Sequence, residues 1–293
     1  MSNNIVNQEV LVGFLDKIVQ KRSIAVRVSD VQPLTGPFGV TVGTSFDKAT
    51  KKFIVEKGEI TAETRKIETH FTYESLEDFK NIYGERFEEM LAYYLSDDLI
   101  YQIDHDFMTM VKTRGALVKT AAFSGAEFNN ALSEVALALL VLVNNEQAKL
   151  PLSDNRSTYS WAVVNNDVGS LISSSLNLEL TDDEKKDPSA SYIGTAAGVN
   201  YYIDFTHDNS ATDAIVFGIK GSSYSRGSTI YSNYKSELIS TTDANSGEGK
   251  IFLIDRTGIA INPLDKPYFD AGKSGFIGKI NVDLSDLEIF KNL

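Results

Sequence analysis

The sequence predicts a mixed α+β fold in which one long helix is followed by a strand-rich region. Apolar residues recur at three- and four-residue spacing over 74–113, which is typical of an amphipathic helix. A strand-forming segment rich in Lys and Glu precedes this helix at 40–73, and short apolar strands alternate with polar loops from 176 onward. The chain has 293 residues, enough to bury one large core or two modest ones.

The part before the long helix divides into a short helix, an extended stretch and a ribbon. Residues 7–21 have the apolar spacing of an amphipathic helix, and Pro33 and Pro37 favour extended chain after it. Residues 40–73 are expected to form a long two-stranded ribbon that reverses at the polar segment 47–52. Because isolated ribbons are marginally stable in water, this one is expected to pack on its own chain or on a neighbouring subunit.

Two helices are predicted to form the centre of the molecule. Gly84 is expected to interrupt the long helix early, and an unbroken run over 85–113 would be about 40 Å long. A second helix is expected at about 125–148, where Ser124 and Glu127 have the spacing of a capping box. Its middle is apolar nearly all round, so we expect it to lie inside a core.

The second half of the chain is predicted to consist mainly of strands. We expect strands at 161–165, 198–205, 214–221 and 250–264, a short helix from 166 to about 174, and a solvated loop at 241–250. Asn166 or Asp167 is suited to cap the short helix.

Composition argues against several functional classes. The chain has no cysteine, which excludes disulfides, thiolate catalysis and Cys-based zinc sites. A net charge of -12 argues against a surface that wraps nucleic acid, which needs clustered Lys and Arg. The longest apolar run, Val135–Val143, is less than half of the roughly 20 residues that span a membrane, and the N-terminus lacks signal-peptide features. We therefore expect no membrane partner.

No catalytic, cofactor-binding or metal-binding set is predicted. Asp104, His105 and Asp106 look like metal ligands, but consecutive helical residues point about 100° apart, so a solvated helix face is the better interpretation. The segment Gly247–Lys250 hints at a phosphate loop, yet Ala244 stands where Gly is required and no Ser or Thr follows the lysine. No serine lies in a G-x-S-x-G turn. We expect no enzyme and no cofactor, with a hydrolase lacking a recognisable site as the alternative.

Six stretches of the chain, taken in order, are similar to the major capsid proteins of T-even-type contractile-tailed bacteriophages. They are Val31–Gly39 (VQPLTGPFG), Thr64–Gly84, Leu95–Asp98 with Gln102–Asp106, Gly198–Asp204 with Ile215–Gly221, Ile230–Tyr234 (IYSNY) and Asp255–Leu264 (DRTGIAINPL). Each match is weak alone, but the collinear order over roughly 25–265 is a strong signal. The chain departs from the family in being shorter, with no room expected for a propeptide or an inserted subdomain, and in having Thr257 where an aromatic residue is common.

The resemblance implies the α+β shell fold of tailed-phage major capsid proteins and encapsulin compartments. Its parts would be an N-terminal arm at 1–35, an extended loop or β-ribbon at 36–73, a peripheral domain with the long spine helix at 74–114 and 256–293, and an axial domain at 115–255. The last strand is expected to pair back beside the long helix.

The implied function is self-assembly into hexamers and pentamers that form an icosahedral or prolate head enclosing double-stranded DNA. The implied partners are other copies of the chain, portal and scaffold proteins, and decoration proteins in some heads, with DNA only as non-specific contents. The implied location is the virion capsid, assembled in the host bacterial cytoplasm. Alternatives are a capsid vertex (pentamer) paralogue, an encapsulin-like compartment, and a tail or baseplate protein.

Charge complementarity suggests where subunits meet. The candidate contact residues are Lys48, Lys51 and Lys52 at the ribbon tip, and Glu88, Glu89 and Asp97 on the acidic outer face of the long helix. The basic tip of one subunit is expected to meet the acidic helix of a neighbour. Each exposed pair contributes only about 0–1 kcal/mol, but the contact is repeated over many copies.

Overall fold

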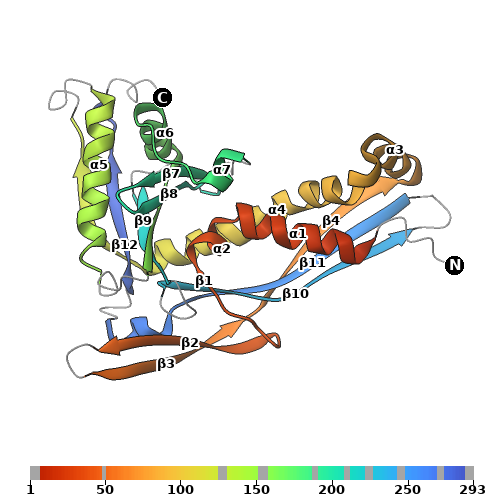
Figure 1. Cartoon of the computed structure of the whole chain (residues 1–293), viewed down its shortest axis with the longest axis horizontal. Coiled ribbons are helices and arrows are strands. Elements are labelled where there is room, and N and C mark those ends of the chain that lie inside the picture. The colour runs from red at the N-terminus through yellow and green to blue at the C-terminus, as the bar shows by residue number, and fades with distance from the viewer. Residues whose placement is uncertain are drawn as a thin grey trace.

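The structure is a computed structural model that describes residues 7–47, 51–124, 131–150, 158–186, 191–207, 212–221, 227–242, 248–268 and 274–287. Figure 1 shows an elongated body built along helix α4, a second lobe standing across one end of that body, and a two-stranded ribbon below the same end. Two clusters of buried apolar side chains form the core: one fills the body and extends into the lobe's sheet through residues such as Trp161 and Val216, and the other is centred in the lobe. The mixed α+β fold class predicted from the sequence is confirmed.

Helices and three sheets make up the described part of the chain. The helices are α1 (Gln8–Arg22), α2 (Ile24–Val28), α3 (Tyr73–Tyr83), α4 (Phe87–Arg114), α5 (Leu132–Gln147), α6 (Asn166–Ser175) and α7 (Asp182–Lys186), with 3-10 helices at Gly84–Arg86 and Pro263–Tyr268. The strands are β1 (Asp30–Val31), β2 (Phe38–Asp47), β3 (Lys52–Thr61), β4 (Glu63–Thr72), β5 (Gly115–Ala122), β6 (Thr158–Val164), β7 (Tyr192–Ala196), β8 (Val199–Ile203), β9 (Ile215–Gly221), β10 (Thr229–Thr242), β11 (Glu248–Ile261) and β12 (Ser274–Asp283). Their sheet orders are β1-β10-β11-β4, β5-β12-β9-β6-β8-β7, and β2-β3.

Helix α4 is the spine of the body and packs, together with α1, over the four-stranded sheet (Figure 1). It has 28 residues and is therefore about 42 Å long. Its buried stripe has the predicted helical spacing and includes Phe87, Leu91, Leu95, Leu99, Ile103, Phe107 and Val111. The predicted interruption at Gly84 is confirmed: this residue has a φ of 56°, which glycine adopts without steric cost, and it separates α3 from α4.

The extended stretch predicted after α1 is wrong for Ile24–Val28, which form helix α2. The cause is a side chain on α4. Asp104 accepts hydrogen bonds from Ser23 Oγ at 2.6 Å and from the backbone N–H groups of Ile24 and Ala25, each at 3.0 Å. These bonds satisfy the free N–H groups at the start of α2. The capping carboxylate lies about eighty residues away in sequence, so no local pattern reveals it.

The ribbon is shorter than the sequence predicts. β2 and β3 pair over Phe38–Thr61 and form the expected two-stranded antiparallel ribbon. β4 does not belong to the ribbon, because it pairs along its whole length with β11 in the four-stranded sheet. Alternate buried side chains such as Arg65 and Ile67 give β4 an inner face beside α4, which explains this placement.

The expectation that the last strand pairs beside the long helix is wrong for β12. This strand lies between β5 and β9, parallel to β5 and antiparallel to β9, in the sheet of the second lobe. Residues 276–280 are buried on both faces, as suits a central strand. Of the four-stranded sheet, β4 and β11 lie beside α4, and β12 also reaches that helix, because Lys279 Nζ donates to the Lys112 carbonyl oxygen. Residues 241–242 and 248–250 of the expected loop belong to β10 and β11, and 243–247 lie outside the described residues.

Helix α5 begins later and is less buried than the sequence predicts. It starts at Leu132, and Glu127 of the proposed capping box lies outside the described residues. One of its faces packs on the six-stranded sheet, whereas Leu137 and Val141 on the other face are exposed. The strand at Trp161 and the helix that follows it are confirmed as β6 and α6, with Asn165 as the N-cap of α6 in place of the next two residues.

Candidate assembly surfaces

The β2–β3 ribbon has two unlike faces, because residues paired across antiparallel strands share a face and alternate along each strand. One face carries Gly39, Thr41, Gly43, Gly58 and Ile60, and it lies against the chain's own 3-10 helix at Pro263–Tyr268. The glycines are required for this close approach. A Cβ on Gly43 would lie 2.7 Å from Leu264 Cγ, and one on Gly58 would lie 2.8 Å from Pro263 Cγ.

The opposite face of the ribbon is open to solvent and carries apolar side chains next to the charged Lys57 and Glu59. Phe38 is 75 % exposed and Val40 is 61 % exposed, and Val55 on the facing strand is also exposed. Val40 further lines an open groove of about 820 Å³ between the ribbon and the C-terminal end of α4, together with Met110 and Ile259. Grouped exposed apolar side chains of this kind mark surfaces that bind other proteins.

The predicted basic tip of the ribbon is described only in part. Lys51 and Lys52 lie at the turn between β2 and β3, and both are exposed. Lys51 has a φ of 55°, as a tight reversal requires. Lys48 lies outside the described residues.

The three predicted acidic contact residues lie on α4, but two of them pair with arginines of their own chain. Asp97 lies 2.7 Å from Arg22 Nη1 of α1, and Glu89 lies 3.2 Å from Arg86 Nε. Glu88 is partly exposed on the first turn of the helix. The pair of Arg22 with Asp97 could not be predicted, because Arg22 reaches α4 only through the packing of α1 on that helix, whereas Arg86 is only three residues from Glu89 in sequence.

The Asp104–Asp106 segment is not the solvated helix face that the sequence suggested. Asp104 is only 4 % exposed and caps α2, while Asp106 accepts a hydrogen bond from Arg65 Nε at 3.2 Å. Burial raises the pKa of Asp104 to about 6, although hydrogen bonds from Ser23 and two backbone N–H groups oppose the shift. Within the described ranges, no group of three or more His, Cys, Asp or Glu residues is placed to hold a metal ion.

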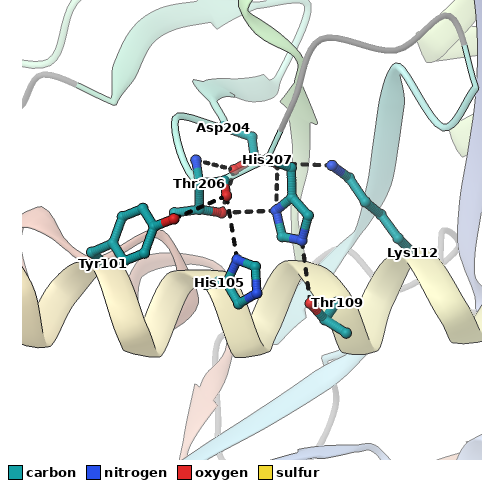
Figure 2. Close-up of polar contacts among 7 residues, drawn as sticks. All are labelled: Tyr101, His105, Thr109, Lys112, Asp204, Thr206 and His207. Atoms are coloured by element: carbon teal, nitrogen blue, oxygen red, sulfur yellow. Dashed lines mark hydrogen bonds and ion pairs between the residues drawn. The ribbon is translucent and has the colours of Figure 1, made fainter.

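His105 belongs to a polar joint between α4 and the segment that follows β8 (Figure 2). Its ring stacks on that of His207, with centroids 4.5 Å apart and planes 9° apart. His105 Nδ1 lies 3.3 Å from the Thr206 carbonyl oxygen, and His207 Nε2 lies 3.2 Å from Thr109 Oγ1. Burial and the nearby charge of Lys112 lower the pKa of His207.

The same joint contains a buried ion pair. Lys112 Nζ donates to Asp204 Oδ2 at 2.9 Å, and Asp204 also accepts from the backbone N–H and the hydroxyl of Thr206. Burial alone would raise the pKa of Asp204, but these hydrogen bonds and the Lys112 charge outweigh it, so the pKa lies below its usual value. The joint ties the second lobe to the spine helix. Its members come from 101–112 and 204–207, and no sequence spacing connects them.

This architecture recurs in solved shell structures. The chain matches a structure described as a virus-like particle from Pyrococcus furiosus with a TM-score of 0.55 and 13 % identity, over 93 % of this chain and 98 % of that one. It matches a chain from Mycobacterium phage Cain with a TM-score of 0.52 and 10 % identity, over 90 % and 91 %. It matches the capsid of an empty GTA particle with a TM-score of 0.51 and 11 % identity, over 88 % of each chain. The fold is therefore that of a capsid shell protein.

The family is shown by the sequence itself. The model of the family described as major capsid protein Gp23 matches residues 17–282, and the chain belongs to that family. It is accordingly a bacteriophage major capsid protein that associates with copies of itself in the virion shell. The resemblance drawn from the six collinear segments is confirmed. No curated protein sequence matches the chain significantly. Across the described residues, no helix is both long and apolar enough to cross a membrane.

Proposed function

We propose that copies of this chain assemble into hexamers and pentamers that form an icosahedral or prolate head around double-stranded DNA. The observation that carries this proposal is the two-faced ribbon. Its glycine-lined face is held by the chain itself, and its apolar face, with Phe38 and Val40, is exposed. A neighbouring subunit that covered the apolar face would remove this strip from water, which is favourable in proportion to the apolar area buried.

In this proposal the parts of the fold have distinct assembly roles. The ribbon is the extended loop that lies over a neighbour. The body formed by α1, α4 and the four-stranded sheet is the peripheral domain, which meets neighbouring capsomers. The lobe with the six-stranded sheet is the axial domain, which gathers subunits around a common axis. The exposed face of α5, with Leu137 and Val141, supports a contact surface on that lobe.

The basic tip is proposed to meet the acidic face of a neighbour's α4. Among the three acidic candidates, Glu88 is the best suited to an intersubunit pair, because Glu89 and Asp97 already pair within the chain. Net charge supports DNA as contents only, since a chain with a net charge of -12 attracts phosphate weakly. Portal, scaffold and decoration proteins are the proposed further partners, assembly in the host cytoplasm is the proposed setting, and no catalytic role is assigned.

Electron microscopy of the purified chain, alone and with candidate scaffold proteins, tests the proposal. Closed shells, tubes or capsomer rings are expected from the unaltered chain. A chain that stays monomeric under all these conditions contradicts the assembly proposal.

Charge reversal tests the tip contact separately. The triple variant Lys48→Glu, Lys51→Glu, Lys52→Glu is expected to remain folded but to form no shells. The matched control replaces the same lysines with Arg, keeps the charges, and is expected to assemble. Adding Glu88→Lys to the triple variant should restore part of the assembly. Unchanged assembly of the reversed variant contradicts the contact, and failure to restore assembly excludes Glu88 as its partner.

A further inference from the structure

Gln32 links the four-stranded sheet of the body to the β2–β3 ribbon. Its backbone N–H donates to the Tyr231 carbonyl oxygen of β10 at 2.9 Å, directly after the two residues of β1 that pair with the same strand. Its side chain bonds to the ribbon: Nε2 donates to the Val42 carbonyl oxygen at 2.9 Å, and Oε1 accepts from the Val42 N–H at 3.1 Å. One residue therefore contacts the body with its backbone and β2 with its side chain.

The Gln32 amide takes the place of a partner strand at the outer edge of β2. In an antiparallel pair, alternate residues direct their N–H and C=O away from the partner strand, where these groups need other partners. Val42 is such a residue, because both of its backbone groups bond to Gln32. Gln32 is only 9 % exposed, and a donor beside an acceptor determines which amide atom faces which. These two hydrogen bonds, the Gln32 clamp, therefore hold the side chain in one orientation.

The segment that carries Gln32 is itself well anchored in the body. Asp30, two residues earlier, is buried and accepts hydrogen bonds from the backbone N–H groups of Gly221 at 2.8 Å and Gly227 at 2.6 Å. The clamp thus connects the ribbon to a fixed part of the fold.

A second contact supports the ribbon next to the clamp. Gly43 follows Val42 and packs on Asn262 and Leu264, where a Cβ would clash. Apolar packing is non-directional, whereas a hydrogen bond weakens steeply when its angle changes. The packing at Gly43 therefore seats the ribbon on the body, and the clamp supplies the contact that depends on direction. The rest of the ribbon, out to the tip, lies beyond these two contacts (Figure 1).

We propose that Gln32 is a positioning residue for shell assembly, which fixes the direction of the ribbon and so presents its exposed face to a neighbouring subunit. This inference rests on the proposed role of the ribbon as a contact between subunits. A ribbon already held in its binding direction loses less conformational entropy when a neighbour binds. An isolated two-stranded ribbon is marginally stable, so without the clamp more of this ordering would have to occur during assembly.

Distance measurements on the unassembled subunit test the clamp without relying on shells. The chain has no cysteine, so spin labels at Lys52→Cys near the ribbon tip and Asp98→Cys on α4 report one distance. Pulsed double electron–electron resonance should give a narrow distance distribution for the otherwise unaltered chain and a distinctly broader one for Gln32→Ala. Gln20→Ala, at an exposed glutamine of α1, is the matched control and should leave the distribution narrow.

Gln32→Glu supplies a reversible test within one protein. A carboxylate accepts from the Val42 N–H but repels the Val42 carbonyl oxygen, so the distribution should be broad at about pH 7.5. A protonated carboxyl accepts and donates as the amide does. Because burial raises the pKa of the introduced carboxyl, the narrow distribution should return at about pH 5.5. The chain with Gln32 and the Gln32→Ala variant should not change between the two pH values. Equal widths in all variants, or no pH dependence in Gln32→Glu, overturn the clamp.

Electron microscopy of the same substitutions without labels connects the clamp to assembly. Gln32→Ala should raise by about tenfold the subunit concentration at which shells form, because each neighbour must then order the ribbon on binding. Gln20→Ala should assemble as the unaltered chain does. A broadened distance distribution with unaltered assembly overturns the positioning role. Absence of shells from the unaltered chain contradicts the proposed function itself, whatever the distance distributions show.

Discussion

The molecule contains two long antiparallel hairpins, β2–β3 and β10–β11, whose surroundings differ. The inner face of β10–β11 is covered by α1 and α4 of the same chain, and Leu253 on that face is fully buried. The apolar face of β2–β3 is open, with Phe38 and Val40 exposed. The two hairpins also differ in backbone pairing, because β10–β11 is flanked by β1 and β4 whereas β2–β3 forms a two-stranded sheet. The β10–β11 hairpin completes a core within the chain, whereas the exposed apolar side chains of β2–β3 form the contact that we propose for another copy.

The largest effect on subunit stability is expected from Leu253→Ala on the covered hairpin. The change removes a buried side chain from a packed core, which should cost about 3 kcal/mol of unfolding free energy. Denaturant unfolding of the dissociated subunit measures this value. Val40→Ala on the open hairpin is the matched control, and a similar loss there would show that the ribbon's apolar face is packed after all.

A somewhat smaller loss is expected from Asp104→Ala, which leaves the Ser23 hydroxyl and two N–H groups of α2 without their acceptor. The expected cost is about 2–3 kcal/mol. Denaturant unfolding measures it, with Asp98→Ala as the exposed control on the same helix. A loss no greater than that of the control would mean that α2 does not depend on its cap.

A smaller, pH-dependent effect is expected at the joint between α4 and the second lobe. The pKa of His207 is lower in the folded chain than in the unfolded chain, so the unfolded state takes up the proton first as pH falls. Stability from this residue is therefore present above the unfolded pKa and is lost as pH falls through the folded pKa. Asp104, whose pKa is raised to about 6, acts in the opposite direction, so only a comparison with a variant isolates His207.

The measurement is the unfolding free energy at about pH 7 and about pH 5 for the unaltered chain and for His207→Gln. The variant should lose less stability between the two pH values than the unaltered chain. His70→Gln, at an exposed histidine on β4, is the control and should behave as the unaltered chain does. An equal decline in both variants would place the pH sensitivity elsewhere.

The smallest effect on subunit stability, and the sharpest test of the comparison, is expected from Val40→Asp on the open face of the ribbon. Exposed positions of this kind change stability by about 0.5 kcal/mol or less. Shell formation, observed by electron microscopy, should nevertheless be lost, because the substitution places a charge in the proposed contact with a neighbour. Ile239→Asp, at an exposed apolar position on β10, is the control and should assemble. Assembly of both variants would show that the exposed apolar side chains of the ribbon take no part in the contact between subunits.

The structural features that the sequence predicts correctly are those determined by neighbouring residues. The break at Gly84, the periodic stripe of α4 and the β2–β3 reversal all follow from residue type and spacing. The features that the sequence does not predict depend on groups far away in the chain. Helix α2 forms because Asp104 caps it, and β4 leaves the ribbon because β11 offers a partner strand.

The candidate surfaces show the same division. Lys51, Lys52 and the acidic residues of α4 lie on the predicted elements. The pair of Arg86 with Glu89 has a local i,i+3 spacing, whereas the pair of Arg22 with Asp97 joins two helices and could not be predicted from spacing. The stacked histidines His105 and His207 combine segments about a hundred residues apart. Only the folded chain brings such groups together.

The position of β12 has a consequence for how the protein is made. This strand joins β5 to β9, and β5 has no other partner strand among the described residues. Chains are synthesised from the N-terminal end, and β12 follows β5 by more than a hundred and fifty residues. During synthesis, β5 therefore has no partner strand until β12 emerges. The second lobe therefore reaches its final form only after β12 has been synthesised. A ribosome-bound subunit whose β12 has not yet emerged thus lacks a finished second lobe to offer to a growing shell.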